Sequence, residues 1–93
     1  MDNTKLSLSR TVCITNPLGL HARAAAKIAK LVEKASAGVW LIKNGEKVDA
    51  SSIIDILTLA AAKDTKITIK IDNPSDVEIL DAIDEMVKEG FGE

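Results

Sequence analysis

The stretch "VWLIKNGEKVDA", residues 39–50, predicts a β-hairpin. Two runs of strand-forming residues, 39–43 and 46–50, flank Asn44 and Gly45. Asn and Gly tolerate the positive φ angles that a two-residue hairpin loop requires. The hairpin therefore supplies two antiparallel strands, and the sheet that contains it is at least partly antiparallel.

Two further strands are predicted on either side of the hairpin, because apolar and polar residues alternate there. In residues 5–15 the apolar side chains fall on even positions, from Leu6 to Ile14. In residues 66–72, "KITIKID", isoleucine occupies every second position. Alternation of this kind buries one face of a strand and exposes the other. The predicted sheet thus has four strands and one buried face.

Apolar residues at helical spacing predict three helices in the remaining segments. The first spans about residues 22–35, the second follows Ser51 or Ser52 as its N-cap, and the third follows a capping box in "SDVE", Ser75–Glu78. The apolar stripes expected to face the core are Ala25, Ile28, Ala29 and Val32, then Ile53, Ile56, Leu57 and Ala60, then Ile79, Leu80, Ile83, Met86 and Val87. The order is βαββαβα, which predicts a single α+β domain over residues 1–93 with its helices on one face of the sheet.

The composition argues against several classes of function. Twelve basic and 14 acidic residues give a formal charge of −2, unlike the basic surface of a nucleic-acid-binding protein. No stretch approaches the roughly 20 apolar residues that span a bilayer, and "MDNTKLSLSR" lacks the apolar segment of a signal peptide. Cys13 has no partner for an internal disulfide and is expected to be a small core or sheet residue. We expect a cytoplasmic monomer with no metal site and no cofactor.

The only histidine, His21, lies in "TNPLGLHARAAAKIAK", residues 15–30, between a loop and the start of the first predicted helix. An imidazole nitrogen can act as a nucleophile near neutral pH. Free N–H groups at the helix start would bind a phosphoryl group on the ring, and Arg23 would add a positive charge. The alternative is that His21 is a weak helix cap and Arg23 a solvated residue, but a basic residue there opposes the helix dipole. The pattern therefore favours a functional His21.

Two stretches, "GLHARAAAKI" (19–28) and "NGEKVDASSIIDILTLAAAK" (44–63), resemble the HPr family of phosphocarrier proteins of the phosphoenolpyruvate-dependent phosphotransferase system. The resemblance covers nearly the whole chain and includes the βαββαβα order. It implies an open-faced β-sandwich, in which an antiparallel sheet of strand order 1-4-2-3 lies under three helices. It also implies a stoichiometric carrier and not an enzyme, phosphorylated by Enzyme I and dephosphorylated by an Enzyme IIA-type domain.

The resemblance further implies roles for individual residues. His21 accepts the phosphoryl group on its Nδ1 atom, and Arg23 steadies that group. Ser52 matches the family's regulatory phosphorylation position, the target of an HPr kinase/phosphorylase, although a serine before a helix is first of all an N-cap. The positions that match the family's docking face are Ala22, Lys27, Ile53, Ile54 and Leu57. Of these, Ile54 is expected to point away from the core.

Three positions depart from the family pattern. Ala24 stands where proline is usual, which loosens the site slightly because proline pre-sets the backbone of a first helical turn. Asp55 and Asp64 stand where glycine is common, and Asp55 adds negative charge near the docking face. "TNPLGLHARAAAKI" resembles the nitrogen-related NPr branch, whereas "EGFGE" resembles Gram-positive-type HPr, so both branches stay open.

Two alternatives to a phosphoryl carrier remain. One is a regulatory HPr-like module whose phosphorylation state controls docking to a kinase, a transporter or a transcription factor. The other is an unrelated α+β domain with an incidental histidine, which leaves "LHAR" at residues 20–23 unexplained.

Overall fold

The computed structural model describes residues 8–93, and the predicted βαββαβα order is confirmed there with two short 3-10 turns added. The elements are β1 (Ser9–Cys13), α1 (Ala22–Val32), β2 (Val39–Lys43), β3 (Glu46–Asp49), α2 (Ile53–Thr58), β4 (Lys66–Ile71), η1 (Pro74–Asp76), α3 (Val77–Lys88) and η2 (Gly90–Gly92). Residues 5–7 of the first predicted strand lie outside the described residues. No helix between residues 8 and 93 has the length and apolar character needed to cross a bilayer.

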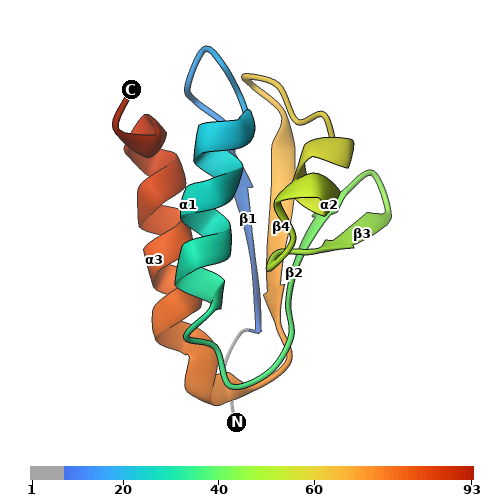
Figure 1. Cartoon of the computed structure of the whole chain (residues 1–93), viewed down its shortest axis with the longest axis vertical. Coiled ribbons are helices and arrows are strands. Elements are labelled where there is room, and N and C mark those ends of the chain that lie inside the picture. Colours follow the sequence, from blue (N-terminus) through green and yellow to red (C-terminus); the bar gives the residue numbers. More distant parts are fainter. Residues whose placement is uncertain (1–7) are drawn as a thin grey trace, which may run out of the picture.

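The four strands form one antiparallel sheet in the order β1-β4-β2-β3. Asn44 and Gly45 adopt φ angles of 50° and 84°, so the left-handed turn between β2 and β3 forms as the sequence predicts. The helices cover one face of this sheet (Figure 1), and both the α+β class and the strand order 1-4-2-3 are confirmed. The N-terminal end of α1 and the C-terminus of the chain lie at the same end of the molecule.

The core lies between the sheet and the helices, and alternation along the strands decides which side chains enter it. Val12 and Ile14 are buried, as are all three isoleucines of β4. The opposite face of the sheet is exposed, and Cys13 lies on it. Cys13 is therefore a sheet residue, as predicted. The alternative prediction of a core residue is wrong, because the odd-numbered side chains of β1 point away from the helices.

The predicted capping box of the third helix is wrong. Asn73 Oδ1 accepts the N–H of Ser75 at 2.8 Å, so Asn73 caps the 3-10 turn η1, and α3 begins only at Val77. The carboxylate of Asp76 instead accepts backbone N–H groups of Ser36 and Ala37 at 2.8–3.1 Å. This buried aspartate ties the start of α3 to the segment after α1, which ends at Val32 instead of the predicted residue 35.

The predicted core stripe of α2 is wrong in part. Ile56 is buried, but Ile53, Leu57 and Ala60 are exposed, and Leu59 enters the core instead. The helix has only six residues, and Ala60 adopts a left-handed φ of 51°, so the chain leaves the helical path before a third turn. As a result α2 presents apolar side chains to solvent.

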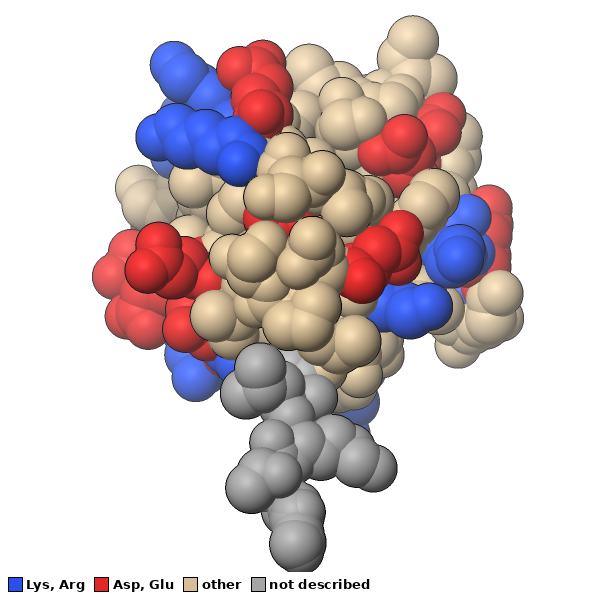
Figure 2. All heavy atoms as spheres, turned by 90° about the horizontal axis from the view of Figure 1, so that it is seen from below, with Lys and Arg blue, Asp and Glu red and all other residues tan. Residues whose placement is uncertain are grey.

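The end of the molecule opposite His21 has a different character. Figure 2 shows that acidic, basic and uncharged side chains are interspersed there. The described positive and negative groups of that end therefore do not form a surface of one sign.

Candidate functional site

The loop before α1 is held against the segment that follows α2. Gly19 N–H donates to Asn16 O at 3.1 Å, and Leu20 N–H donates to Ala61 O at 2.9 Å. Gly19 has a φ of +66°, and a Cβ atom there would lie 2.5 Å from Ala61 O. Only glycine satisfies both the left-handed backbone and this close approach. Because Gly19 and Leu20 are fixed against Ala61, the backbone of His21, which follows them, has a defined position.

His21 is the N-cap residue of α1, with φ −81° and ψ −178°, but its side chain makes no capping hydrogen bond. The Nδ1 atom lies 3.2 Å from Gly19 O, and the Nε2 atom lies 3.0 Å from Glu93 Oε2. The side chain is 26% exposed. His21 thus occupies the cap position, as the alternative interpretation holds, but its ring contacts other partners instead of capping the helix, and part of it stays open to solvent.

The start of α1 offers positive charge beside this ring. Its first N–H groups have no partner within the helix, and its first turn contains no acidic residue. Arg23 is exposed, and its side chain makes no hydrogen bond or ion pair with any residue from 8 to 93. Ala24, where the family usually has proline, is fully buried. The helix start can therefore bind an anion at the imidazole.

Ser52 is the N-cap of α2, as predicted, because its Oγ accepts the N–H of Asp55 at 3.2 Å. The turn before it is held by Asp49, whose Oδ1 accepts the Oγ–H and the N–H of Ser51 at 2.7 and 2.8 Å. Both bonds lower the pKa of the Asp49 carboxyl below its ordinary value, and the bond from the Ser51 hydroxyl has the larger effect. Ser52 is partly accessible at this corner.

Large apolar side chains are exposed close to this end of α1. The exposed fractions are 75% for Ile54, 65% for Leu18, 40% for Ile53 and 39% for Leu57. The helix that carries three of them, α2, packs against α1 (Figure 1). Ala22 and Lys27, the other predicted docking residues, are exposed on α1. The predicted docking residues are thus on two adjoining helices, and Leu18 joins them from the loop.

Two site residues were missed in the sequence analysis, Asn16 and Glu93. Asn16 is buried, and its Nδ2 donates to Gly19 O at 2.9 Å and to Glu93 Oε1 at 3.2 Å. Nothing in the local sequence signals this contact, because the two residues are 77 positions apart. Among residues 8–93, no group of three or more His, Cys, Asp and Glu side chains is arranged to hold a metal ion.

Comparison with known proteins shows the family to which the chain belongs. Residues 8–89 match the family described as "PTS HPr component phosphorylation site". The chain is 40% identical to phosphocarrier protein HPr of Cupriavidus necator, in an alignment that covers 92% of this chain and 97% of the relative. It is 38% identical to phosphocarrier protein NPr of Klebsiella oxytoca, in an alignment that covers 95% of this chain and 99% of that relative. The crystal structure of HPr from Thermoanaerobacter tengcongensis superposes with a TM-score of 0.85 at 30% identity, covering 91% of this chain and 96% of that one. The chain therefore belongs to the HPr family of phosphocarrier proteins of the phosphotransferase system.

Proposed function

We propose that His21 accepts a phosphoryl group from phosphorylated Enzyme I in the cytoplasm and passes it to an Enzyme IIA-type domain. The observation that carries the proposal is the partly exposed imidazole of the only histidine at the N-terminal end of α1. The lone pair of Nδ1 attacks phosphorus while the bond from phosphorus to the donor atom of Enzyme I breaks, and that electron pair stays on the donor. In the second transfer Nδ1 is the leaving group. The protein acts as a carrier and not as a catalyst.

The start of α1 suits a group that must be held and then released. The first-turn N–H groups and the Arg23 guanidinium stabilise the charge on the phosphoryl oxygens in both transfers. Because Arg23 is exposed and unpaired among residues 8–93, it can reach the group without first breaking a bond. Such positioning and charge stabilisation are what phosphoryl transfer mainly requires.

The test is incubation with phosphoenolpyruvate and Enzyme I, followed by mass spectrometry and acid treatment. We expect one phosphoryl group that is labile in acid and is found on His21, since a phosphoserine survives acid. Enzyme I from both a sugar system and a nitrogen-related system should be tried, because the chain is similar to relatives of both branches. Failure to gain a phosphoryl group from any of several such donors would overturn the carrier proposal.

The exposed residues Ile53, Ile54 and Leu57 support a docking face shared by donor and acceptor. An apolar centre beside a basic group such as Arg23 suits partners that bind in turn and leave quickly, whereas the Lys27 ammonium is already hydrogen-bonded to Phe91 O. We expect Ile54→Glu to weaken binding to Enzyme I and to the acceptor by about tenfold, because it places a charge at the most exposed large apolar side chain of residues 8–93. Titration of both partners measures the effect.

The matched control for Ile54→Glu is Thr11→Glu, which adds the same charge to the exposed face of the sheet. The control should bind both partners normally, and both variants should keep the wild-type melting temperature. Full affinity of Ile54→Glu, or a large fall in its melting temperature, would contradict a docking role for Ile54.

Ser52 supports a second, regulatory function, because it directly precedes the exposed Ile53 and Ile54. A phosphate there, added by an HPr kinase/phosphorylase, would face any partner on α2. We expect Ser52→Asp to slow phosphorylation of His21 by Enzyme I several-fold, mainly through KM, because it adds a negative charge to the docking face. Initial rates at low and high salt measure the effect.

Ser52→Asn is the matched control, because asparagine has the shape of aspartate, caps a helix equally well and carries no charge. We expect Ser52→Asn to react at the wild-type rate. If Ser52→Asp also reacts at that rate, Ser52 is an N-cap only. If both variants are equally slow, charge is not the cause.

A further inference from the structure

The strand β2 ends in a charged residue on the side of the sheet that faces the helices. Successive side chains of a strand alternate between its two faces, so Val39, Leu41 and Lys43 share one face of β2. Val39 and Leu41 are buried in the core, and Lys43 is half-buried at its rim. An ammonium group in such a place needs partners, because a charge that leaves water unpaired is costly to bury.

The partners of the Lys43 ammonium are backbone carbonyls at the end of α2. Lys43 Nζ donates to Leu59 O at 2.9 Å and to Ala60 O at 3.3 Å, and it forms no ion pair with an acidic side chain of residues 8–93. The last carbonyl groups of a helix have no partner within the helix, and a lysine can supply one. Lys43 therefore holds the end of α2 against the hairpin, beside which this helix lies (Figure 1).

The same segment of the chain holds the loop that carries His21. Ala60 adopts a left-handed φ of 51°, and the next carbonyl, Ala61 O, accepts the N–H of Leu20 at 2.9 Å. Three successive carbonyls at the end of α2 are thus bonded either to Lys43 or to the residue that precedes His21. A shift of this segment would move both the exposed apolar side chains of α2 and the loop before His21.

We propose that Lys43 is a positioning residue, which holds the end of α2 so that the docking face and the loop before His21 keep their relative places. This inference rests on the proposed functions of His21 and of the exposed residues of α2. Lys43 acts without touching a partner protein, because its ammonium is bonded to the two carbonyls. Its loss should therefore impair recognition of the partners more than the transfer step.

The test compares Lys43→Met with Lys43→Arg. Methionine keeps an unbranched side chain without the charge, whereas arginine can still donate to both carbonyls. We expect Lys43→Met to raise KM for phosphorylation by Enzyme I about tenfold and to change kcat by less than about threefold. The transfer step is less affected because the loop before His21 keeps its other hydrogen bond, from Gly19 N–H to Asn16 O. Lys43→Arg should restore KM to within about twofold of the wild-type value.

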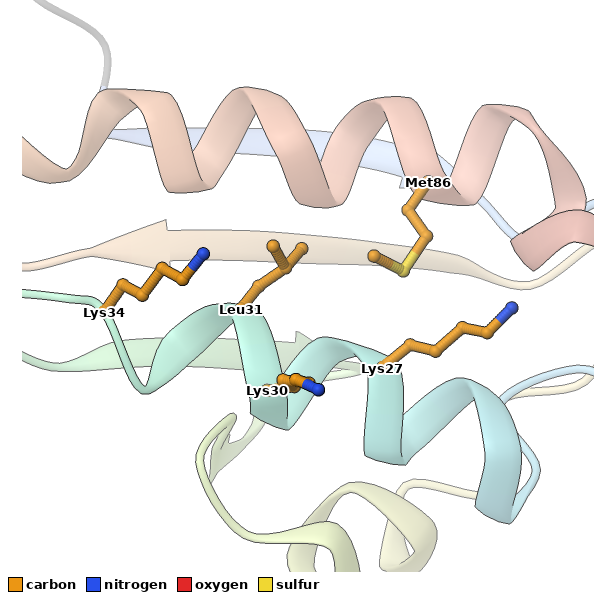
Figure 3. Close-up of a pocket in the computed structure, with 5 residues that line it drawn as sticks. All are labelled: Lys27, Lys30, Leu31, Lys34 and Met86. Carbon is orange, nitrogen blue, oxygen red and sulfur yellow. The ribbon is translucent and has the colours of Figure 1, made fainter.

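Lys34→Met is the matched control, because it removes the same charge from an exposed lysine. The Lys34 ammonium makes no hydrogen bond or ion pair with a described residue. Figure 3 shows that its side chain extends from the chain after α1 toward α3, into a pocket whose other lining residues are Lys27, Lys30, Leu31 and Met86. We expect Lys34→Met to react with the wild-type KM.

Salt dependence separates positioning from a direct attraction between Lys43 and a partner. Attraction between exposed charges is screened by salt, whereas a hydrogen bond within the protein is missing from the variant at every salt concentration. The rise in KM of Lys43→Met, relative to wild type, should therefore persist at high salt.

A second readout is amide hydrogen exchange, which needs no partner protein. The N–H of Leu20 donates to Ala61 O, so its exchange reports whether the end of α2 still holds the loop. We expect exchange at Leu20 to be at least about tenfold faster in Lys43→Met than in the wild type, Lys43→Arg or Lys34→Met. Ile69 lies in the interior strand β4, and its amide should exchange at one rate in all four proteins.

The two readouts separate the positioning role from other roles of Lys43. The positioning role is overturned if Lys43→Met changes neither KM nor exchange at Leu20, or only one of them. Equally faster exchange at Ile69 also overturns it, because Lys43 then stabilises the whole fold. A rise in KM that disappears at high salt overturns it as well, because Lys43 then acts through its charge. If no Enzyme I phosphorylates the wild type, the carrier function fails, and exchange at Leu20 still decides whether Lys43 holds the loop.

Discussion

His21→Ala is expected to abolish acceptance of a phosphoryl group from Enzyme I while changing the free energy of unfolding by no more than about 1 kcal/mol. The loss is complete because the chain has no other imidazole. The fold survives because His21 is partly exposed and its side chain does not cap α1. Mass spectrometry after incubation with phosphoenolpyruvate and Enzyme I measures the first effect, and denaturant unfolding measures the second.

Ser52→Ala is the control for this experiment, because it removes the other proposed phosphorylation position and should still gain the acid-labile group. The acceptor assignment is wrong if His21→Ala is phosphorylated at the wild-type rate. A large loss of stability in His21→Ala would instead show that the contacts of the ring with Glu93 and Gly19 hold the two ends of the chain together.

Phe91→Ala is expected to lower the free energy of unfolding by about 3–5 kcal/mol. Phe91 is among the largest fully buried side chains and lies in the core cluster, so its truncation leaves a cavity. The same change should release the C-terminal turn, and with it the contacts of Glu93 with His21 and Asn16. Denaturant unfolding and ¹⁵N spectra of the ring measure the two effects.

Phe91→Leu is the matched variant, since it keeps most of the buried apolar volume and should lose clearly less stability than Phe91→Ala. Glu93→Gln completes the comparison, because it removes the carboxylate that contacts His21 without opening a cavity in the core. A loss below about 1 kcal/mol in Phe91→Ala would show that the turn does not depend on Phe91 for its place.

Local patterns in the sequence determined most of the elements. The alternating isoleucines of β4 specify which face of that strand is buried, because successive side chains of a strand point to opposite sides. Asn44 and Gly45 specify the hairpin, because they accept the left-handed backbone that its turn needs. Ser52 specifies the start of α2, because its hydroxyl accepts the N–H of Asp55, only three residues further along the chain. The position of His21 at the start of α1 was also predicted correctly, since the change from loop to helix lies within a few residues of it.

The tertiary structure decided what no local pattern contains. The exposure of Ile53 and Leu57 follows from how far the short helix α2 continues before the chain turns into the loop that meets Gly19. The predicted capping box does not form because Ser75 lies inside the 3-10 turn η1, which Asn73 caps, and α3 begins only at Val77. The Asp76 carboxylate ties this turn to the N–H groups of Ser36 and Ala37, which are far away in the sequence.

The contact of Asn16, His21 and Glu93 is the clearest case of this kind. It joins residues that are more than 70 positions apart in the sequence. It exists because Phe91 is buried in the core and Lys27 Nζ donates to Phe91 O in the turn that carries Glu93. Alternation and helical periodicity describe neighbours along the chain, up to about one helical turn. Contacts between distant residues depend on how the whole core packs, and only the folded molecule determines that.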